Sequence, residues 1–124
     1  MARILVVDDE PLLRRTLRAI LERAGHEVLE AVDGAKALNV FVESHPDLVL
    51  IDMVMPNREG AETIVDLRAA GCVPIIAMSG AGGDSGALYL RIAAEVGADR
   101  TLAKPIRAAA LLEAVAACLV PVAG

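Results

Sequence analysis

The chain has 124 residues, the length of one compact domain, and its residues are 56% hydrophobic but only 2% aromatic, so its core must be aliphatic. Its net charge of −5 argues against direct nucleic-acid binding, which depends on clustered Lys and Arg. No segment is long and apolar enough for a signal peptide or a membrane span, which predicts a soluble, cytoplasmic protein without a membrane partner. The two cysteines lack the spacing of a zinc or redox site.

Short apolar runs alternate five times with segments of helical periodicity. Pro11 at a first helical turn and Gly25 just past its end mark the bounds of the first helix, and Asp33 can cap the second. The predicted strands are Arg3–Val7, Glu27–Ala31, Leu48–Ile51, Pro74–Met78 and Arg100–Ala103. The predicted helices are Pro11–Ala24, Asp33 to about His45, about Gly60 to the residue before Gly71, Ala87–Val96 and Ala108–Val120.

This alternation predicts the fold class. Strands this short and uniformly apolar are buried on both faces, and strict strand–helix alternation requires right-handed crossovers to a parallel sheet. We therefore expect an α/β fold with a doubly wound, five-stranded parallel sheet. The sequence shows no linker, repeat or low-complexity segment, so residues 1–124 are predicted to form a single domain.

Chemically active residues follow four of the five strands. The first strand ends in Asp8, Asp9 and Glu10, and the others end in Asp52, Ser79 and Lys104. Ligands of an open parallel sheet bind beyond the carboxyl ends of its strands, and the strand order 2-1-3-4-5 makes the first and third strands neighbours. Asp8, Asp9 and Asp52 should therefore converge at one point.

Three neighbouring carboxylates repel one another unless a cation lies between them. Mg²⁺ prefers oxygen ligands, which predicts a magnesium site there. An Asp carboxylate is also a nucleophile that can accept a phosphoryl group. Phosphoryl transfer needs charge neutralisation, which Mg²⁺ and Lys104 would supply, and Ser79 can hydrogen-bond the arriving group. Asp9 has a simpler alternative role as a cap of the first helix.

Four segments carry a family resemblance: LVVDDE, DLVLIDMVMPNREG, the apolar strand ending in Ser79, and GADRTLAKP. They resemble, in order and over nearly the whole chain, the motifs of the response-regulator receiver domain of the CheY-like, stand-alone type. The resemblance implies a flavodoxin-like (βα)₅ fold and a Mg²⁺-dependent phosphoacceptor site.

The resemblance also implies a role for each site residue. Asp9 would bind Mg²⁺ directly, Asp8 mainly through water, and Asp52 as both ligand and phosphoacceptor. Val54 would offer its backbone carbonyl to the metal. Ser79 would be the switch hydroxyl and Lys104 would contact the phosphoryl oxygens, with a cis peptide bond between Lys104 and Pro105. Thr101 stands where receivers usually carry an aromatic switch residue.

The predicted function is that of a single-domain response regulator in a two-component phosphorelay. Its partners would be a histidine kinase or histidine phosphotransfer protein and a downstream protein that the sequence does not identify. It would be no enzyme beyond its own phosphorylation and dephosphorylation. The face made by the fourth helix, fifth strand and fifth helix is predicted to dock a partner or to form a phosphorylation-dependent homodimer.

Three other functions fit the pattern less well. A haloacid-dehalogenase-like hydrolase carries a second Asp two residues after its nucleophile, where this chain has Val54. A flavodoxin-like FMN carrier needs a hydroxyl-rich loop after the first strand, where this chain has three acidic residues. A receiver that acts without phosphorylation would not need the complete acidic set.

Overall fold

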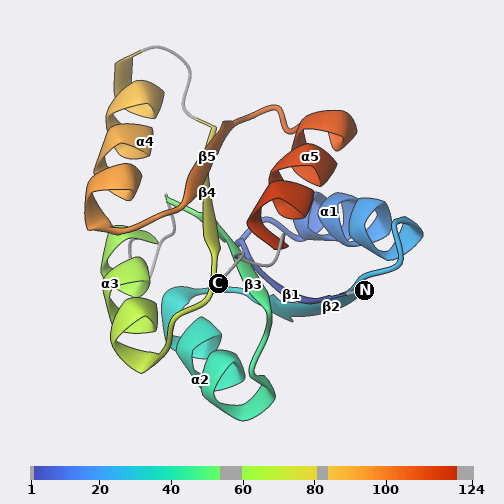
Figure 1. Ribbon diagram of the computed structural model, residues 1–124. Coiled ribbons are helices and arrows are strands. Elements are labelled where there is room, and N and C mark those ends of the chain that lie inside the picture. The colour runs from blue at the N-terminus through green and yellow to red at the C-terminus, as the bar shows by residue number, and fades with distance from the viewer. Residues whose placement is uncertain (1, 54–59, 81–83, 120–124) are drawn as a thin grey trace.

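The computed structural model describes residues 2–53, 60–80 and 84–119, with only the backbone for residues 84–87. Strands and helices alternate along this part of the chain (Figure 1). The strands are β1 (Arg3–Val7), β2 (Glu27–Ala31), β3 (Leu48–Asp52), β4 (Ile75–Ser79) and β5 (Arg100–Ala103). The helices are α1 (Pro11–Arg23), α2 (Gly34–Ser44), α3 (Gly60–Ala70), α4 (Asp84–Val96) and α5 (Ala108–Leu119).

The strands form one parallel sheet in the order β2-β1-β3-β4-β5, which confirms the predicted α/β doubly wound fold. Successive side chains of a strand point to opposite faces, so each apolar strand supplies two cores. Leu5 and Val7 face the layer formed by α2, α3 and α4, whereas Ile4 and Val6 face α1 and α5 (Figure 1). The middle of the sheet is thereby covered on both sides.

The predicted boundary signals act as expected. Pro11 is the first residue of α1, and Gly25 follows the end of that helix with a φ of 95°, a left-handed conformation that favours glycine. The side chain of Asp33 caps α2 by accepting a hydrogen bond from the backbone N–H of Lys36, at 2.9 Å.

Several element boundaries differ from the prediction. β3 and β4 extend through Asp52 and Ser79, because Asp52 still pairs with Met78 of β4 and Ser79 still pairs with Ala103 of β5. Helix α4 begins at Asp84 and not at Ala87. Apolar periodicity locates the buried turns of a helix, so it misses a first turn that is rich in polar residues and glycine.

Helix α5, part of the predicted docking face, is apolar most of the way round. Its larger apolar residues Leu111 and Val115 are buried against the sheet, together with Ala114. Several of its exposed positions are alanines, which leave little apolar surface uncovered.

Among the described helices, none is both long enough and apolar enough to cross a membrane.

Candidate active site

The carboxyl ends of β1 and β3 bring three carboxylates together. One carboxylate oxygen from each of Asp8, Asp9 and Asp52 lies within 4.8 Å of the other two. Asp8 and Asp52 are buried and Asp9 is exposed, so the cluster opens to solvent on the Asp9 side. The convergence predicted from the strand order is therefore present.

Lys104 supplies the positive charge of the site. It follows β5, two strands away from β3, and its Nζ lies 2.9 Å from Oδ2 of Asp52 and 3.5 Å from Oδ2 of Asp8. Burial by itself would lower the pKa of Lys104, but the hydrogen bond and charge of Asp52 and the charge of Asp8 outweigh burial and raise it. The ammonium is thus fully protonated at neutral pH. The Lys104–Pro105 peptide bond is cis, as the resemblance implied.

Three hydrogen bonds hold the backbone and the carboxylate of Asp8 in place. Its N–H donates to the carbonyl of Ala31 at 3.2 Å, and its Oδ1 accepts from the N–H of Glu10 at 2.9 Å. Its own carbonyl accepts from Arg14 at 2.8 Å. Burial raises the pKa of Asp8; the charge of Asp52 acts in the same direction, and the Glu10 hydrogen bond and Lys104 oppose the rise only in part.

Ser79 ends β4 beside the end of β3. It is only 2% exposed, and its Oγ has no hydrogen-bond partner among the described residues. A buried hydroxyl without a partner costs free energy, so a water, an ion or a ligand is expected to complete it. This orphaned oxygen lies on the strand next to Asp52, as a phosphoryl-binding hydroxyl should.

The donor set suits a hard divalent cation. All three carboxylates offer oxygen, and the capping alternative for Asp9 is not supported, because the N-cap of α1 is Glu10. Asp8, Asp9 and Asp52 would hold such a cation with an open side toward solvent. The carbonyl of Val54, the fourth predicted ligand, lies outside the described residues.

The raised pKa of Asp8 gives a stability prediction for the metal-free protein. The folded state binds the Asp8 proton more tightly than the unfolded state, so this contribution is fully present below 3.8, the ordinary pKa, and is lost as pH rises through the folded pKa. At pH 7 the ionised carboxylate is therefore unfavourable. We expect Asp8→Asn, which keeps the acceptor for Glu10, to raise the melting temperature by a few degrees in chelator.

Thermal melts between pH 4 and pH 7 test this expectation. The advantage of Asp8→Asn in chelator should grow with pH, and saturating Mg²⁺ should shrink it because the cation favours the wild-type carboxylate. A lower melting temperature for Asp8→Asn at pH 7 in chelator would contradict the argument.

Two glycines allow the close approaches that build the site. A Cβ on Gly60 would lie 2.6 Å from both the carbonyl oxygen of Asp52 and the Cα of Met53, so α3 can begin directly against the end of β3. A Cβ on Gly80 would lie 2.5 Å from Cδ of Lys104, whose stem passes over this position. Neither contact was predicted from the sequence, although the position of Gly80 directly after Ser79 was a usable signal.

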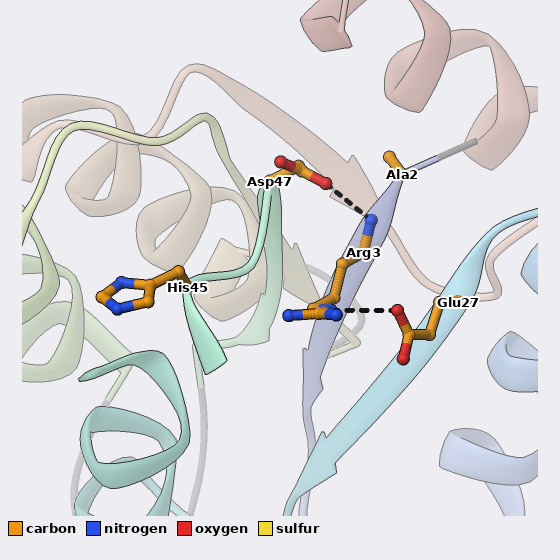
Figure 2. A pocket seen from close by; sticks show the side chains of 5 residues that line it. All are labelled: Ala2, Arg3, Glu27, His45 and Asp47. Atoms are coloured by element: carbon orange, nitrogen blue, oxygen red, sulfur yellow. Dashed lines mark hydrogen bonds and ion pairs between the residues drawn. The ribbon is translucent and has the colours of Figure 1, made fainter. Parts of the chain in front are cut away.

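A hollow lies at the end of the sheet opposite the carboxylate cluster and is lined by Ala2, Arg3, Glu27, His45 and Asp47 (Figure 2). Its charged groups already pair with one another: Oδ2 of Asp47 accepts from the N–H of Arg3 at 2.8 Å, and Nε of Arg3 lies 2.9 Å from Oε2 of Glu27. Ligands of parallel sheets bind at the other end of the strands. This hollow is therefore the weaker candidate.

Comparisons with known sequences agree with the geometry. A family model described as the response regulator receiver domain matches residues 4–116. The chain is 32% identical over 118 residues to the protein PilG of Pseudomonas aeruginosa, covering 93% of this chain and 85% of PilG. It is 38% identical over 103 residues to the probable transcriptional regulator ycf27 of Porphyridium aerugineum, covering 83% of this chain but only 42% of that protein.

Solved structures show the same architecture. The chemotaxis protein CheY4 of Vibrio cholerae matches with a TM-score of 0.86 and 29% identity, over 96% of this chain and 99% of that chain. A receiver domain protein of Clostridium thermocellum matches with a TM-score of 0.88 and 30% identity, over 96% and 94% of the two chains.

Proposed function

Because this chain belongs to the response regulator receiver domain family, we propose that it accepts a phosphoryl group on Asp52 in a Mg²⁺-dependent reaction and signals in this phosphorylated form. The observation that supports the proposal best is the position of Asp52. Its buried carboxylate lies within 4.8 Å of those of Asp8 and Asp9, and its Oδ2 lies 2.9 Å from the ammonium of Lys104.

In the proposed step, a carboxylate oxygen of Asp52 attacks phosphorus and forms a P–O bond. The bond from phosphorus to the donor breaks, and the donor atom, a histidine nitrogen or an acetate oxygen, leaves with the electron pair. Bound Mg²⁺ would neutralise charge on the phosphoryl oxygens. Lys104 stabilises the same oxygens, and the hydroxyl of Ser79 donates a hydrogen bond to one of them. Beyond this self-modification we propose no enzymatic activity.

Intact mass spectrometry tests the proposal. After incubation with acetyl phosphate and Mg²⁺, the protein should gain the mass of one phosphoryl group, and chelator should prevent the gain. Labelling that is equal with Mg²⁺ and with chelator would refute the metal requirement.

A hollow beside the site offers a docking surface for a phosphodonor protein. It lies between α1 and the connection from β5 to α5, and its lining residues are Glu10, Leu12, Leu13, Thr16, Lys104, Pro105 and Ile106. Leu12 is 68% exposed, the largest value among the exposed large hydrophobic residues of the described chain. Since Lys104 both lines this hollow and contacts Asp52, a protein bound there could present a phosphohistidine to the site. We propose a histidine kinase or histidine phosphotransfer protein as its occupant.

Leu12→Arg should separate the protein donor from the small donor. We expect transfer from a phosphotransfer protein that labels the wild type to fall about 10-fold, as for a buried interface residue, while labelling by acetyl phosphate stays unchanged. Val65→Arg is the matched control, because Val65 is 52% exposed but lies on α3, on the other face of the sheet. Equal loss with both donors would place the defect in the site and not in docking.

The signalling surface that we propose comprises α4, β5 and α5. Leu88 and Thr101 are exposed there, and Thr101 lacks the ring that an aromatic switch residue would move. The acidic net charge favours a protein or a second copy of the chain as the partner over nucleic acid. Addition of beryllofluoride, a phosphoryl mimic, should change amide hydrogen exchange on this surface or the mass measured by light scattering. No change in either measurement would remove support for this surface.

A further inference from the structure

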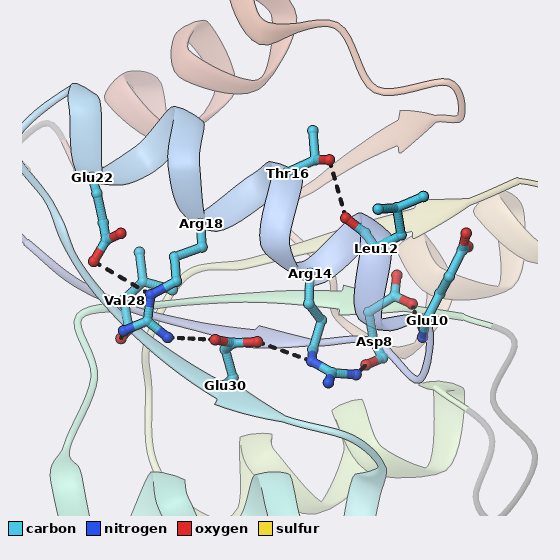
Figure 3. A network of polar contacts seen from close by, with 9 residues as sticks. All are labelled: Asp8, Glu10, Leu12, Arg14, Thr16, Arg18, Glu22, Val28 and Glu30. Carbon is cyan, nitrogen blue, oxygen red and sulfur yellow. Dashed lines mark hydrogen bonds and ion pairs between the residues drawn. The ribbon is translucent and has the colours of Figure 1, made fainter.

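A chain of charged side chains runs from the edge of the sheet to the backbone of Asp8 (Figure 3). Nη1 of Arg14 donates to the carbonyl oxygen of Asp8 at 2.8 Å, and Nε of Arg14 lies 2.9 Å from Oε1 of Glu30 on β2. Arg18, one turn further along α1, also pairs with Glu30 and reaches Glu22 and the carbonyl of Val28. Of these two arginines, Arg14 is the one that contacts Asp8.

Arg14 stands where a positive charge is unfavourable. It lies in the first turns of α1, whose N-terminal end carries the positive end of the helix dipole, and that first turn has no acidic residue. The side chain is also only 15% exposed. Side chains on a helix lean toward its N-terminus, which directs Arg14 back to the loop that carries Asp8. The helix dipole therefore does not explain why an arginine stands here, whereas its contacts with Glu30 and the carbonyl of Asp8 do.

Glu30 compensates this charge. Burial would raise the pKa of Glu30, but hydrogen bonds from Arg18 and Arg14 outweigh burial and lower it, so the carboxylate remains ionised at neutral pH. The planar guanidinium of Arg14 can meet Glu30 and the Asp8 carbonyl at the same time. With Ala31 on its N–H and Glu10 on its Oδ1, Asp8 is fixed at three atoms, and its Oδ2 is directed toward Lys104.

We propose that Arg14, held by Glu30, is a positioning residue for the metal site, because it fixes the backbone that presents Asp8 and Asp9. The inference rests on the proposed function, since it concerns the cation that these carboxylates would hold. Groups that orient metal ligands without touching the metal commonly change metal affinity when they are removed.

A purely electrostatic role and a positioning role of Arg14 predict opposite changes in Mg²⁺ affinity when Arg14 is removed. If Arg14 acted only through its charge, its loss would lower the positive potential near the carboxylates and tighten Mg²⁺ binding. If it acts by positioning, its loss loosens the turn and weakens binding. The sign of the change in Mg²⁺ affinity therefore separates the two possibilities.

Titration calorimetry with Mg²⁺ on four proteins provides the test. Arg14→Ala should bind Mg²⁺ about 10-fold more weakly than the wild type, at the low end of the range for such positioning groups. Arg14→Lys should recover part of the loss, because one ammonium cannot span both acceptors as the guanidinium does. Arg18→Ala is the matched control, which loses a partner of Glu30 but no contact with Asp8, and it should bind like the wild type.

Amide hydrogen exchange in chelator gives a second readout that needs no metal. The N–H of Glu10, which donates to Asp8, should exchange faster in Arg14→Ala than in the wild type and Arg18→Ala. If Arg14→Ala does not fold, Arg14→Met replaces it, because Met keeps an unbranched stem but loses the charge and the donors, and the same weaker Mg²⁺ binding is expected. Unchanged or tighter Mg²⁺ binding by Arg14→Ala, or an equal loss in Arg18→Ala, would overturn the positioning role. A wild type that binds no Mg²⁺ would instead refute the proposed function.

Discussion

Asp52→Asn should not gain a phosphoryl group from acetyl phosphate and Mg²⁺ under conditions that label the wild type completely. The amide has almost the same shape as the carboxylate but lacks the negatively charged oxygen that attacks phosphorus. It also removes one of the three carboxylates of the metal cluster, so nucleophile and cation site are lost together. The readout is intact mass with peptide mapping of the modified site.

Asp47→Asn is the matched control for this experiment. Asp47 precedes β3 at the opposite end of the same strand and pairs with the backbone of Arg3, an acceptor role that Asn can keep. This variant should label like the wild type. Full labelling of Asp52→Asn would show that the modification does not depend on Asp52. Loss of labelling in Asp47→Asn would show that the effect is not specific to the cluster.

Lys104→Met should have two opposite effects, tighter Mg²⁺ binding and slower phosphorylation. The ammonium of Lys104 lies 2.9 Å from Asp52 and 3.5 Å from Asp8, so it competes with a divalent cation for the same carboxylates. Removing it should tighten Mg²⁺ binding severalfold. The same change removes a charge that stabilises the phosphoryl oxygens in the transition state, which should slow labelling about 10²-fold at saturating Mg²⁺.

Methionine is the appropriate replacement because it keeps an unbranched stem of similar length to pass over Gly80. Lys36→Met serves as the control, since Lys36 is exposed on α2 and its side chain has no part in the site. Calorimetry gives the Mg²⁺ affinity and a time course of intact mass gives the rate. Tighter binding with a wild-type rate would mean that Lys104 only neutralises the acidic cluster in the metal-free protein.

The sequence by itself determined the order of the elements and the identity of the cluster. Strand runs such as Leu48–Ile51 are apolar throughout because a doubly wound sheet buries both faces, and this pattern needs no tertiary information to be read. Asp8, Asp9, Asp52, Ser79 and Lys104 were identified because parallel strands bring their carboxyl ends to one edge, so the residue after each strand is placed by topology alone. The cap at Asp33 and the turn at Gly25 depend on neighbouring residues only.

Other features were decided only when distant segments packed together. The sequence shows Arg14 as one of several arginines on a polar helix face, and only the packing of α1 over β2 gives it Glu30 and the Asp8 carbonyl as partners. Glycine is needed at positions 60 and 80 because the backbone of Asp52 and the side chain of Lys104 approach them too closely for a Cβ atom. Burial of Asp8 and the unpartnered hydroxyl of Ser79 likewise depend on surrounding elements. Local patterns record periodicity and turns, whereas the contacts of a long side chain depend on segments far away in the sequence, so only the tertiary structure determines them.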